Sequence, residues 1–227
     1  MADLGGHTML RRTHDVALRA DCGPVFVLTD SPEVAEEVGS FGGRVIMTDP
    51  DLDSGTARIA SVVDRLPGEI VVNLQGDAPL TDPRVLAAGA EEAARTGAPV
   101  TMPIYRISDP GELHDPSVIK VVMAHDGQTL YVSRSPLPHV RDVDPAAWPA
   151  EAACWAHTGI YIYSRAFLED FGSLPASPLE RAERLEQLRW LQAGVEIQTL
   201  EVDPQGPSVD TQADLEHVRA HFEAARG

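Results

Sequence analysis

The rest of the chain is built around one stretch, Val71-Val72-Asn73-Leu74-Gln75-Gly76-Asp77-Ala78-Pro79-Leu80. It begins as an apolar, β-branched run, which is typical of a strand buried on both faces of a sheet. It ends in polar, turn-forming residues at the carboxyl edge of that strand, where open α/β sheets bind their ligands. Gly76 lets the backbone approach a ligand closely, and Asp77 offers a carboxylate to a hard cation. A second interpretation stays open here, in which Asp77 only caps the helix that follows.

Strands and helices alternate on both sides of this stretch. Strands are expected at 24–28, 44–47, 69–75 and 195–202, and helices at 8–20, 31–38, 57–66, 83–95, 166–171, 178–193 and 211–225. Regular alternation of this kind predicts an α/β fold of three layers, Rossmann-like and doubly wound, with a mostly parallel sheet. The whole chain, 1–227, is interpreted as a single domain of this class.

The pattern changes between residues 100 and 150. Three extended segments are expected at 100–107, 117–124 and 128–133, and His125-Asp126-Gly127 is a hairpin signal between the last two. A loop rich in proline and aspartate follows, before a further strand at 155–163. We expect residues 100–150 to form an inserted surface that serves as a dimer contact or a lid.

Composition limits the possible functions. The chain has 227 residues, 43% of them hydrophobic, and a formal net charge of −17 at pH 7. That charge argues against a nucleic-acid partner, because no basic stripe is available to meet phosphates. Membrane spans and a signal peptide are not expected, since no stretch is long and apolar enough. Cys22 and Cys154 lack metal-ligand spacing and are expected to be reduced thiols of a cytoplasmic protein.

Several polar residues have two interpretations on the sequence alone. Ser54 is a helix cap or a ligand contact, and Asp210 favours a helix dipole or binds a metal. Lys120, the single lysine of the chain, interrupts an apolar strand and is expected to point to solvent. His157 and Tyr161 fall on one face of a strand. Along the helix at 178–193, the stripe formed by Glu183, Glu186 or Gln187, and Trp190 is solvated by default.

Taken together, the motifs resemble one family closely, the 3-deoxy-manno-octulosonate cytidylyltransferases, and the resemblance runs in collinear order along almost the whole chain. The pieces that carry it are Asp51-Leu-Asp-Ser-Gly-Thr-Ala-Arg58, Val72-Asn-Leu-Gln-Gly-Asp-Ala-Pro79, Val118-Ile-Lys-Val-Val122, Leu130-Tyr-Val-Ser-Arg134, His157-Thr-Gly-Ile-Tyr-Ile-Tyr163, Ser177-Pro-Leu-Glu180, Leu185-Glu-Gln-Leu-Arg189 and Val209-Asp-Thr-Gln-Ala-Asp-Leu215.

The resemblance implies a nucleotidyltransferase fold and an enzyme that joins CTP to a small acidic 2-keto sugar, releases pyrophosphate and works as a homodimer. Catalysis of this type rests on positioning and on neutralising charge with Mg²⁺. Asp77 and Asp210 are implied to be the catalytic metal ligands. The nucleotide is implied to contact Ser54, Gly55, Thr56 and Gln75, and the sugar acid Arg134, His157, Tyr161, Glu186 and Gln187.

The sequence also departs from the family pattern. Leu52 stands where the family usually has histidine, and Ala78 stands where a glutamate follows Asp77. Met1 to Leu10 align with the family segment that follows its first strand and phosphate-binding loop. A start codon assigned too late and a true truncation are both consistent with this alignment. Two alternatives to the leading function therefore stay open, a cytidylyltransferase for another acid, such as a phosphonate or a nonulosonic acid, and a catalytically silent homologue.

Overall fold

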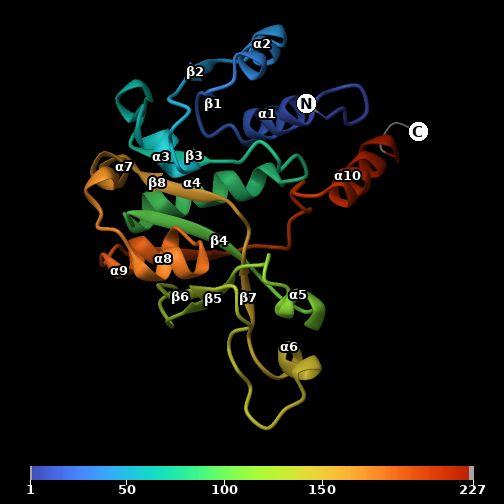
Figure 1. Ribbon diagram of the computed structural model, residues 1–227, viewed down its shortest axis with the longest axis vertical. Helices are drawn as coiled ribbons and strands as arrows, with labels where there is room; N and C mark the ends of the chain where they lie inside the picture. Colours follow the sequence, from blue (N-terminus) through green and yellow to red (C-terminus); the bar gives the residue numbers. More distant parts are fainter. Residues whose placement is uncertain (1, 225–227) are drawn as a thin grey trace.

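The computed structural model describes residues 2–224 of the chain, whose elements are drawn in Figure 1. The helices are α1 (Met9–Ala20), α2 (Pro32–Ser40), α3 (Gly55–Ala60), α4 (Pro83–Thr96), α5 (Pro110–His114), α6 (Trp148–Glu151), α7 (Arg165–Asp170), α8 (Pro178–Glu183), α9 (Gln187–Gln192) and α10 (Gln212–Ala224). The strands are β1 (Val27–Thr29), β2 (Val45–Met47), β3 (Ile70–Asn73), β4 (Val100–Arg106), β5 (Lys120–Met123), β6 (Thr129–Ser133), β7 (Trp155–His157), β8 (Tyr161–Ser164) and β9 (Ile197–Glu201).

Local chemistry explains where the helices begin. The hydroxyls of Thr8, Ser31 and Ser54 accept hydrogen bonds from the backbone amides of Arg11, Val34 and Ala57 at the first turns of α1, α2 and α3. Such caps satisfy amides that have no partner inside a helix. The predicted capping box before α10 is also present, because the amide of Thr211 donates to Asp214 and the amide of Asp214 donates to Thr211. The predicted end of this helix, Ala225, lies outside the described residues.

The larger sheet has seven strands in the order β3-β8-β4-β7-β5-β6, with β9 on β4. The α/β class is confirmed, but the expectation of a mostly parallel sheet is wrong, because β4–β9 is the one parallel pair in this sheet among the described residues. Both β3 and β4 run antiparallel to β8 and therefore in the same direction as each other. β3, β4 and β9 therefore run in one direction, and β8 is inserted between two of them. Residues 100–106 were expected in the inserted surface, but they form β4, which is paired on both edges inside the core sheet.

Helices cover the larger sheet on both faces, which gives the three predicted layers. On one face, Ile70 and Val72 of β3 pack with Val85 and Leu86 of α4. On the other face, Val71 belongs to a larger core that contains residues of α3, α7 and α9 (Figure 1). Alternate side chains of a strand point to opposite faces, so β3 contributes to both cores. Among residues 2–224, no helix is long and apolar enough to cross a bilayer.

Two predicted elements are each broken into two. The strand expected at 155–163 becomes β7 and β8, because Gly159 adopts a positive φ of 84° between them. The two halves pair with different parts of β4, β7 with Ile104–Arg106 and β8 with Val100–Thr101. The helix expected at 178–193 becomes α8 and α9, because Arg184 adopts a φ of 52°. A residue in this left-handed region ends a helix.

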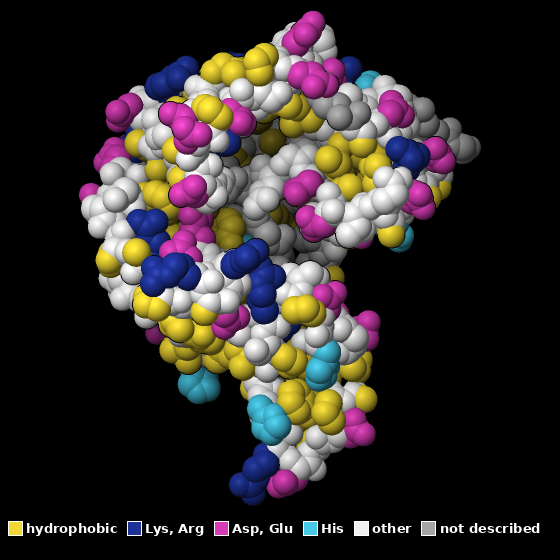
Figure 2. Space-filling model, viewed as in Figure 1, with side chains coloured by type: hydrophobic (Ala, Val, Ile, Leu, Met, Phe, Trp, Pro, Cys, Tyr) yellow, Lys and Arg dark blue, Asp and Glu magenta, His cyan; other side chains and the backbone are white. Residues whose placement is uncertain are grey.

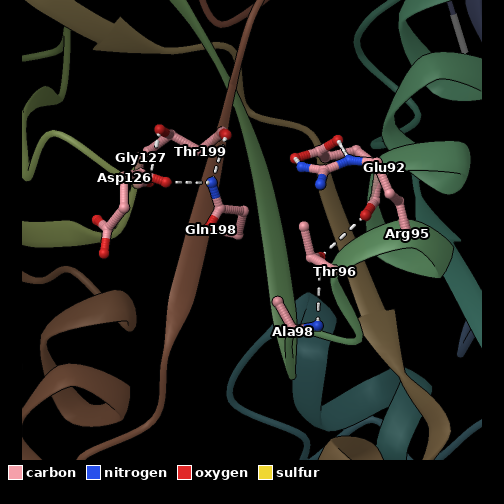
Figure 3. Close-up of polar contacts among 8 residues, drawn as sticks. All are labelled: Glu92, Arg95, Thr96, Ala98, Asp126, Gly127, Gln198 and Thr199. Atoms are coloured by element: carbon pink, nitrogen blue, oxygen red, sulfur yellow. Dashed lines mark hydrogen bonds and ion pairs between the residues drawn. The ribbon is translucent and has the colours of Figure 1, made fainter.

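The predicted hairpin at residues 125–127 is confirmed as the turn between β5 and β6. Gly127 has a φ of 84°, as such turns require. The turn is held against β9, where the Thr199 hydroxyl donates to the Gly127 carbonyl at 2.7 Å and the Gln198 amide donates to the Asp126 carbonyl at 3.2 Å (Figure 3). The inserted segment is therefore fixed to the core sheet at its hairpin tip.

Candidate active site

Asp77 and Asp210, which are far apart in the sequence, lie side by side in the structure. The amide of Val209 donates to the carbonyl of Asp77 at 2.9 Å, which ties the loop before α10 to the turn after β3. Burial raises the pKa of Asp77, and the neighbouring Asp210 carboxylate raises it further. Within residues 2–224, no arginine, lysine or histidine forms an ion pair with either carboxylate. Two such carboxylates repel each other and favour a cation between them.

A second polar cluster joins α3 to the start of α9. Ser54 donates to Oε1 of Glu186 and Thr56 donates to Oε2, each at 2.6 Å. Thr56 also shares a 2.9 Å hydrogen bond with the Tyr163 hydroxyl, to which the Asn73 amide donates at 3.4 Å. The Glu186 carboxylate is therefore held by two hydroxyls and connected to the end of β3. Burial raises the pKa of Glu186, and the bonds from Ser54 and Thr56 oppose that shift.

The cluster continues along β8 through aromatic side chains. Gln187 donates to the Tyr161 hydroxyl, and the rings of Tyr161 and His157 lie with centroids 4.4 Å apart. Nε2 of His157 lies 3.1 Å from the Ile160 carbonyl. Burial lowers the pKa of His157 to about 4, so this side chain is neutral at pH 7. The structure thus brings together His157, Tyr161, Glu186, Gln187, Ser54 and Thr56.

Arg134 is occupied by backbone carbonyls. Its guanidinium donates to the carbonyls of Glu183 at 2.7 Å and Pro116 at 2.8 Å. The Glu183 carboxylate accepts hydrogen bonds from the Arg134 amide at 2.7 Å and from the Ser133 hydroxyl at 2.8 Å. Arg134 and Glu183 therefore hold the end of β6 against the break between α8 and α9, three residues before Glu186. The structure gives no hydrogen bond between Arg134 and the cluster of His157 and Glu186.

The expectation that Lys120 points to solvent is wrong. Its side chain is fully buried, and Nζ donates to the carbonyls of Asp115 and Val118 at 2.7 Å each. Burial lowers the pKa of this amine. The default expectation that one polar stripe of the 178–193 helix faces solvent is also wrong, because Gln187 and Trp190 of that stripe are buried. A strand or helix periodicity does not show which polar side chains find backbone partners inside the fold.

Gln75 and Gly55 lie at the edge of a cleft of about 640 Å³ that β1, β3, α1 and α3 line. The Gln75 side chain forms no hydrogen bond within the described residues, and Gly55 lies beside the Asn73 amide at the start of α3. Sequence reasoning missed three residues that connect the site, Asn73, Tyr163 and Glu183. The sequence did carry a signal for Tyr163, which is in step with His157 and Tyr161.

Comparison with known proteins defines the class. A family model described as cytidylyltransferase matches residues 1–197. A solved structure described as CMP:2-keto-3-deoxy-manno-octonic acid synthetase complexed with CTP superposes with a TM-score of 0.91 at 39% identity, covering 99% of this chain and 91% of that chain. A glucose-1-phosphate thymidylyltransferase structure from Bacillus anthracis, described there as putative, shares the fold alone, at a TM-score of 0.66 and 15% identity. The fold and site thus define a nucleotidyltransferase.

Two curated relatives narrow that class. The 3-deoxy-manno-octulosonate cytidylyltransferase of Syntrophotalea carbinolica is 40% identical over 230 residues, which cover 98% of this chain and 91% of the relative. The enzyme of the same name from Escherichia coli is 40% identical over 224 residues, which cover 97% of this chain and 87% of the relative. The chain belongs to the family of 3-deoxy-manno-octulosonate cytidylyltransferases, and it is an enzyme of the cytidylyltransferase class.

Proposed function

We propose that this protein transfers CMP from CTP to the anomeric hydroxyl of a 2-keto sugar acid of the 3-deoxy-manno-octulosonate type and releases pyrophosphate. The observation that carries the proposal is the hydrogen-bond network in which Ser54 and Thr56 meet Glu186. The first two were predicted to contact the nucleotide, and Glu186 the sugar acid. A reaction that joins two substrates requires their binding residues to lie in one site, within reach of each other.

The second polar cluster would hold the sugar acid. Tyr161 and Gln187 present a hydroxyl and an amide, and neutral His157 presents a ring nitrogen, as recognition of sugar hydroxyls requires. Glu186 accepts two hydrogen bonds and keeps a fixed carboxylate beside them. Arg134 would bind the carboxylate of the acid through its planar guanidinium, exchanging a backbone carbonyl for the ligand.

Asp77 and Asp210 would hold Mg²⁺. Their residue types fit that ion, because Mg²⁺ prefers oxygen ligands and is usually bound by one or two carboxylates together with phosphate oxygens and water. Among the described residues no third acidic, histidine or cysteine side chain joins them in a metal-binding group. When bound, Mg²⁺ supplies charge neutralisation for the triphosphate. By holding the ion, the two carboxylates would help to position the triphosphate of CTP for transfer.

Pyrophosphate release tests the proposal. Purified protein is assayed with CTP or UTP, with and without Mg²⁺, and with 3-deoxy-manno-octulosonate, N-acetylneuraminate or a simple phosphonate as acceptor. We expect release with CTP, Mg²⁺ and 3-deoxy-manno-octulosonate together. A higher kcat/KM for either other acceptor would replace the acid while keeping cytidylyl transfer. No release with any acceptor, and no thermal shift with CTP and Mg²⁺, would leave a catalytically silent homologue.

The protein is further proposed to act as a homodimer in the cytoplasm, with residues 100–150 in the dimer contact. β6 is at the edge of the larger sheet, and its Leu130 is 60% exposed. An exposed apolar side chain on an edge strand is suited to burial against a second copy. Light scattering of the purified protein and of Leu130→Glu tests this. A dimer that Leu130→Glu converts to monomer is the expected result, and a monomeric parent protein would contradict it.

A further inference from the structure

One glutamate holds Arg134 by both its main chain and its side chain. Oε2 of Glu183 accepts a hydrogen bond from the Arg134 amide at 2.7 Å, and the Glu183 carbonyl accepts one from Nε of Arg134, also at 2.7 Å. The same carboxylate accepts from the hydroxyls of Ser133 at 2.8 Å and Tyr131 at 3.2 Å. Glu183 therefore fixes both the backbone from which the Arg134 side chain starts and the orientation of its guanidinium.

The guanidinium of Arg134 is oriented but keeps donors for a ligand. It has five N–H groups. The carbonyls of Glu183, Pro116 and Arg184 accept from Nε, Nη1 and Nη2 at 2.7, 2.8 and 3.4 Å. Each terminal nitrogen therefore keeps one N–H group without a protein acceptor within residues 2–224, and the long bond to Arg184 is the one that a ligand would replace. Two terminal nitrogens of this kind bind a carboxylate through parallel hydrogen bonds.

The two shorter anchors of this guanidinium belong to segments that carry predicted sugar-acid residues. Glu183 ends α8, three residues before Glu186. Pro116 lies in the turn before β5, and the Ile119 carbonyl that follows this turn accepts from the His157 amide at 2.9 Å. The arginine is therefore held by the same two segments that place Glu186 and His157, although it forms no hydrogen bond with either side chain within the described residues.

The turn that contains Pro116 is fixed independently of Glu183. Nζ of the buried Lys120 donates to the carbonyls of Asp115 and Val118, on either side of Pro116, at 2.7 Å each. A change at Glu183 therefore leaves the second anchor of the guanidinium in place. The effect of such a change on Arg134 can be measured in a folded protein.

Charge around α8 favours an anionic ligand beside this arginine. The chain as a whole carries a formal net charge of −17 at pH 7. Figure 2 shows basic side chains on the surface where Figure 1 places α8, and Arg181 and Arg184 at the end of this helix are exposed. A local cluster of positive charge on an acidic protein attracts an anion to that place. A carboxylate is therefore the ligand chemistry that suits Arg134.

We propose, on the premise of the proposed function, that Glu183 is the positioning residue of the carboxylate subsite and holds Arg134 in the orientation that binds the acid substrate. Glu183 touches no substrate in this role, because its carboxylate is occupied by Tyr131, Ser133 and the Arg134 amide. The alternative is a structural role, in which Glu183 only fastens the end of β6 to α8. The two roles differ in which Michaelis constant Glu183 controls.

Steady-state kinetics of pyrophosphate release distinguish these roles. In Glu183→Ala the Arg134 amide loses its acceptor, so we expect KM for 3-deoxy-manno-octulosonate to rise at least about tenfold and KM for CTP to change less than about twofold. Glu183→Gln keeps an oxygen that accepts from this amide and is expected to restore KM for the acid to within about threefold of the parent value. Glu196→Ala, at an exposed position outside the site, should leave both constants unchanged. Equal rises in both KM values would overturn the proposal.

A double-mutant cycle tests whether Glu183 acts through Arg134. Arg134→Gln removes the guanidinium, so adding Glu183→Ala to it is expected to raise KM for the acid by less than about twofold more. Fully additive effects of the two substitutions would overturn the proposal. Where Glu183→Ala does not fold, Glu183→Asp takes its place with the same expectations, because it keeps the charge but shortens the side chain by one methylene.

Hydrogen exchange measures the contact between Glu183 and Arg134 without turnover. By NMR, the amide and Nε–H of Arg134 are expected to exchange at least about tenfold faster in Glu183→Ala than in the parent protein. Unchanged exchange in that variant would overturn the proposal even in an active enzyme. No pyrophosphate release by the parent protein with any acceptor would instead refute the proposed function, and with it the substrate role of Glu183, whatever the exchange rates.

Discussion

Oγ of Ser54 lies 2.6 Å from Oε1 of Glu186, a hydrogen bond that joins residues 132 positions apart in the chain. Thr56 donates to the second carboxylate oxygen at the same distance. Since Ser54 also accepts from the Ala57 amide, one hydroxyl both caps α3 and holds the carboxylate. These hydrogen bonds of the site therefore fix the start of α3 to the start of α9.

Glu186→Gln tests the importance of that carboxylate. The amide keeps the shape of the side chain, but its NH₂ group faces a hydroxyl that has lost its acceptor. Hydrogen bonds to charged groups contribute about 1.5–3 kcal/mol, so we expect kcat/KM to fall about 10- to 150-fold. Unfolding is expected to change by less than about 1 kcal/mol, because the variant also avoids burying a charge. Pyrophosphate release and urea denaturation provide the two measurements.

The control for this variant is Glu196→Gln, an exposed glutamate just before β9. It removes the same charge outside the site and is expected to leave kcat/KM unchanged. Equal activity of Glu186→Gln and the parent protein would show that the network serves the fold and not the reaction.

Mg²⁺ and CTP are expected to stabilise the protein through Asp77. Ligand at about 100 times its Kd contributes about 2.7 kcal/mol, which raises Tm by about 5–10 °C for a chain of this size. Asp77→Asn removes a carboxylate whose pKa burial and Asp210 raise, so the variant should fold at least as stably without ligand. Differential scanning fluorimetry with and without Mg²⁺ and CTP should show the shift in the parent protein and its loss in the variant.

Asp203→Asn is the matched control, because Asp203 is an exposed aspartate that lies a few residues before Asp210 in the sequence. Its Mg²⁺-dependent shift should equal that of the parent protein. A full shift in Asp77→Asn would remove this residue from the metal site, whatever its effect on turnover.

Much of the fold could be predicted because the signals are local. Ser31 and Ser54 begin helices, and His125-Asp126-Gly127 makes a hairpin, through contacts within a few residues. The position of β8 between β3 and β4 depends on long-range pairing, which periodicity does not contain. Alternation of strands and helices indicates the direction of each strand but not which strand lies next to it. A parallel sheet was inferred for this reason.

His157 gives the folded protein a pH dependence in the acidic range. Its folded-state pKa is about 4, below the usual 6.5, so the unfolded chain binds the proton first as pH falls. Stability is therefore complete above pH 6.5 and is lost as pH falls toward 4. At about 1.4 kcal/mol for each pKa unit, the loss is expected to be roughly 3 kcal/mol. Urea denaturation across this range should show it, and His157→Gln should flatten the curve.

The His157→Gln variant distinguishes the contribution of His157 to the acid loss of stability from that of other titrating groups. Tyr161 lies beside His157, Glu186 lies near Tyr161, and both are unchanged in His157→Gln. A stability profile in the variant as steep as that of the parent protein would assign the acid loss to carboxylates instead.

The candidate site was predictable in part for the same reason. Asp77 and Asp210 each belong to a recognisable local motif, which left a capping or dipole role and a metal role open for both, and the family resemblance implied that they bind a metal. The contacts that join Arg134 to Glu183 were not predictable, because the partners of the Arg134 guanidinium are backbone carbonyls of distant segments. Backbone groups have no sequence signature, so side chains that bind them look the same as solvated ones.

Lys120 offers a final prediction, because it is the single lysine of the chain and is fully buried. Its Nζ donates to the carbonyls of Asp115 and Val118, so acetylation of this amine requires the strand to open. We expect an amine-acetylating reagent to modify Lys120 at least about 10³-fold more slowly in native buffer than in concentrated urea, as marginal stability implies. Peptide mass spectrometry measures this. Lys120→Met, which leaves two buried carbonyls without a donor, should lower the free energy of unfolding by about 2 kcal/mol. Acetylation at equal rates in both conditions would contradict this prediction. It would show that the Lys120 amine reaches solvent, as the sequence alone predicts.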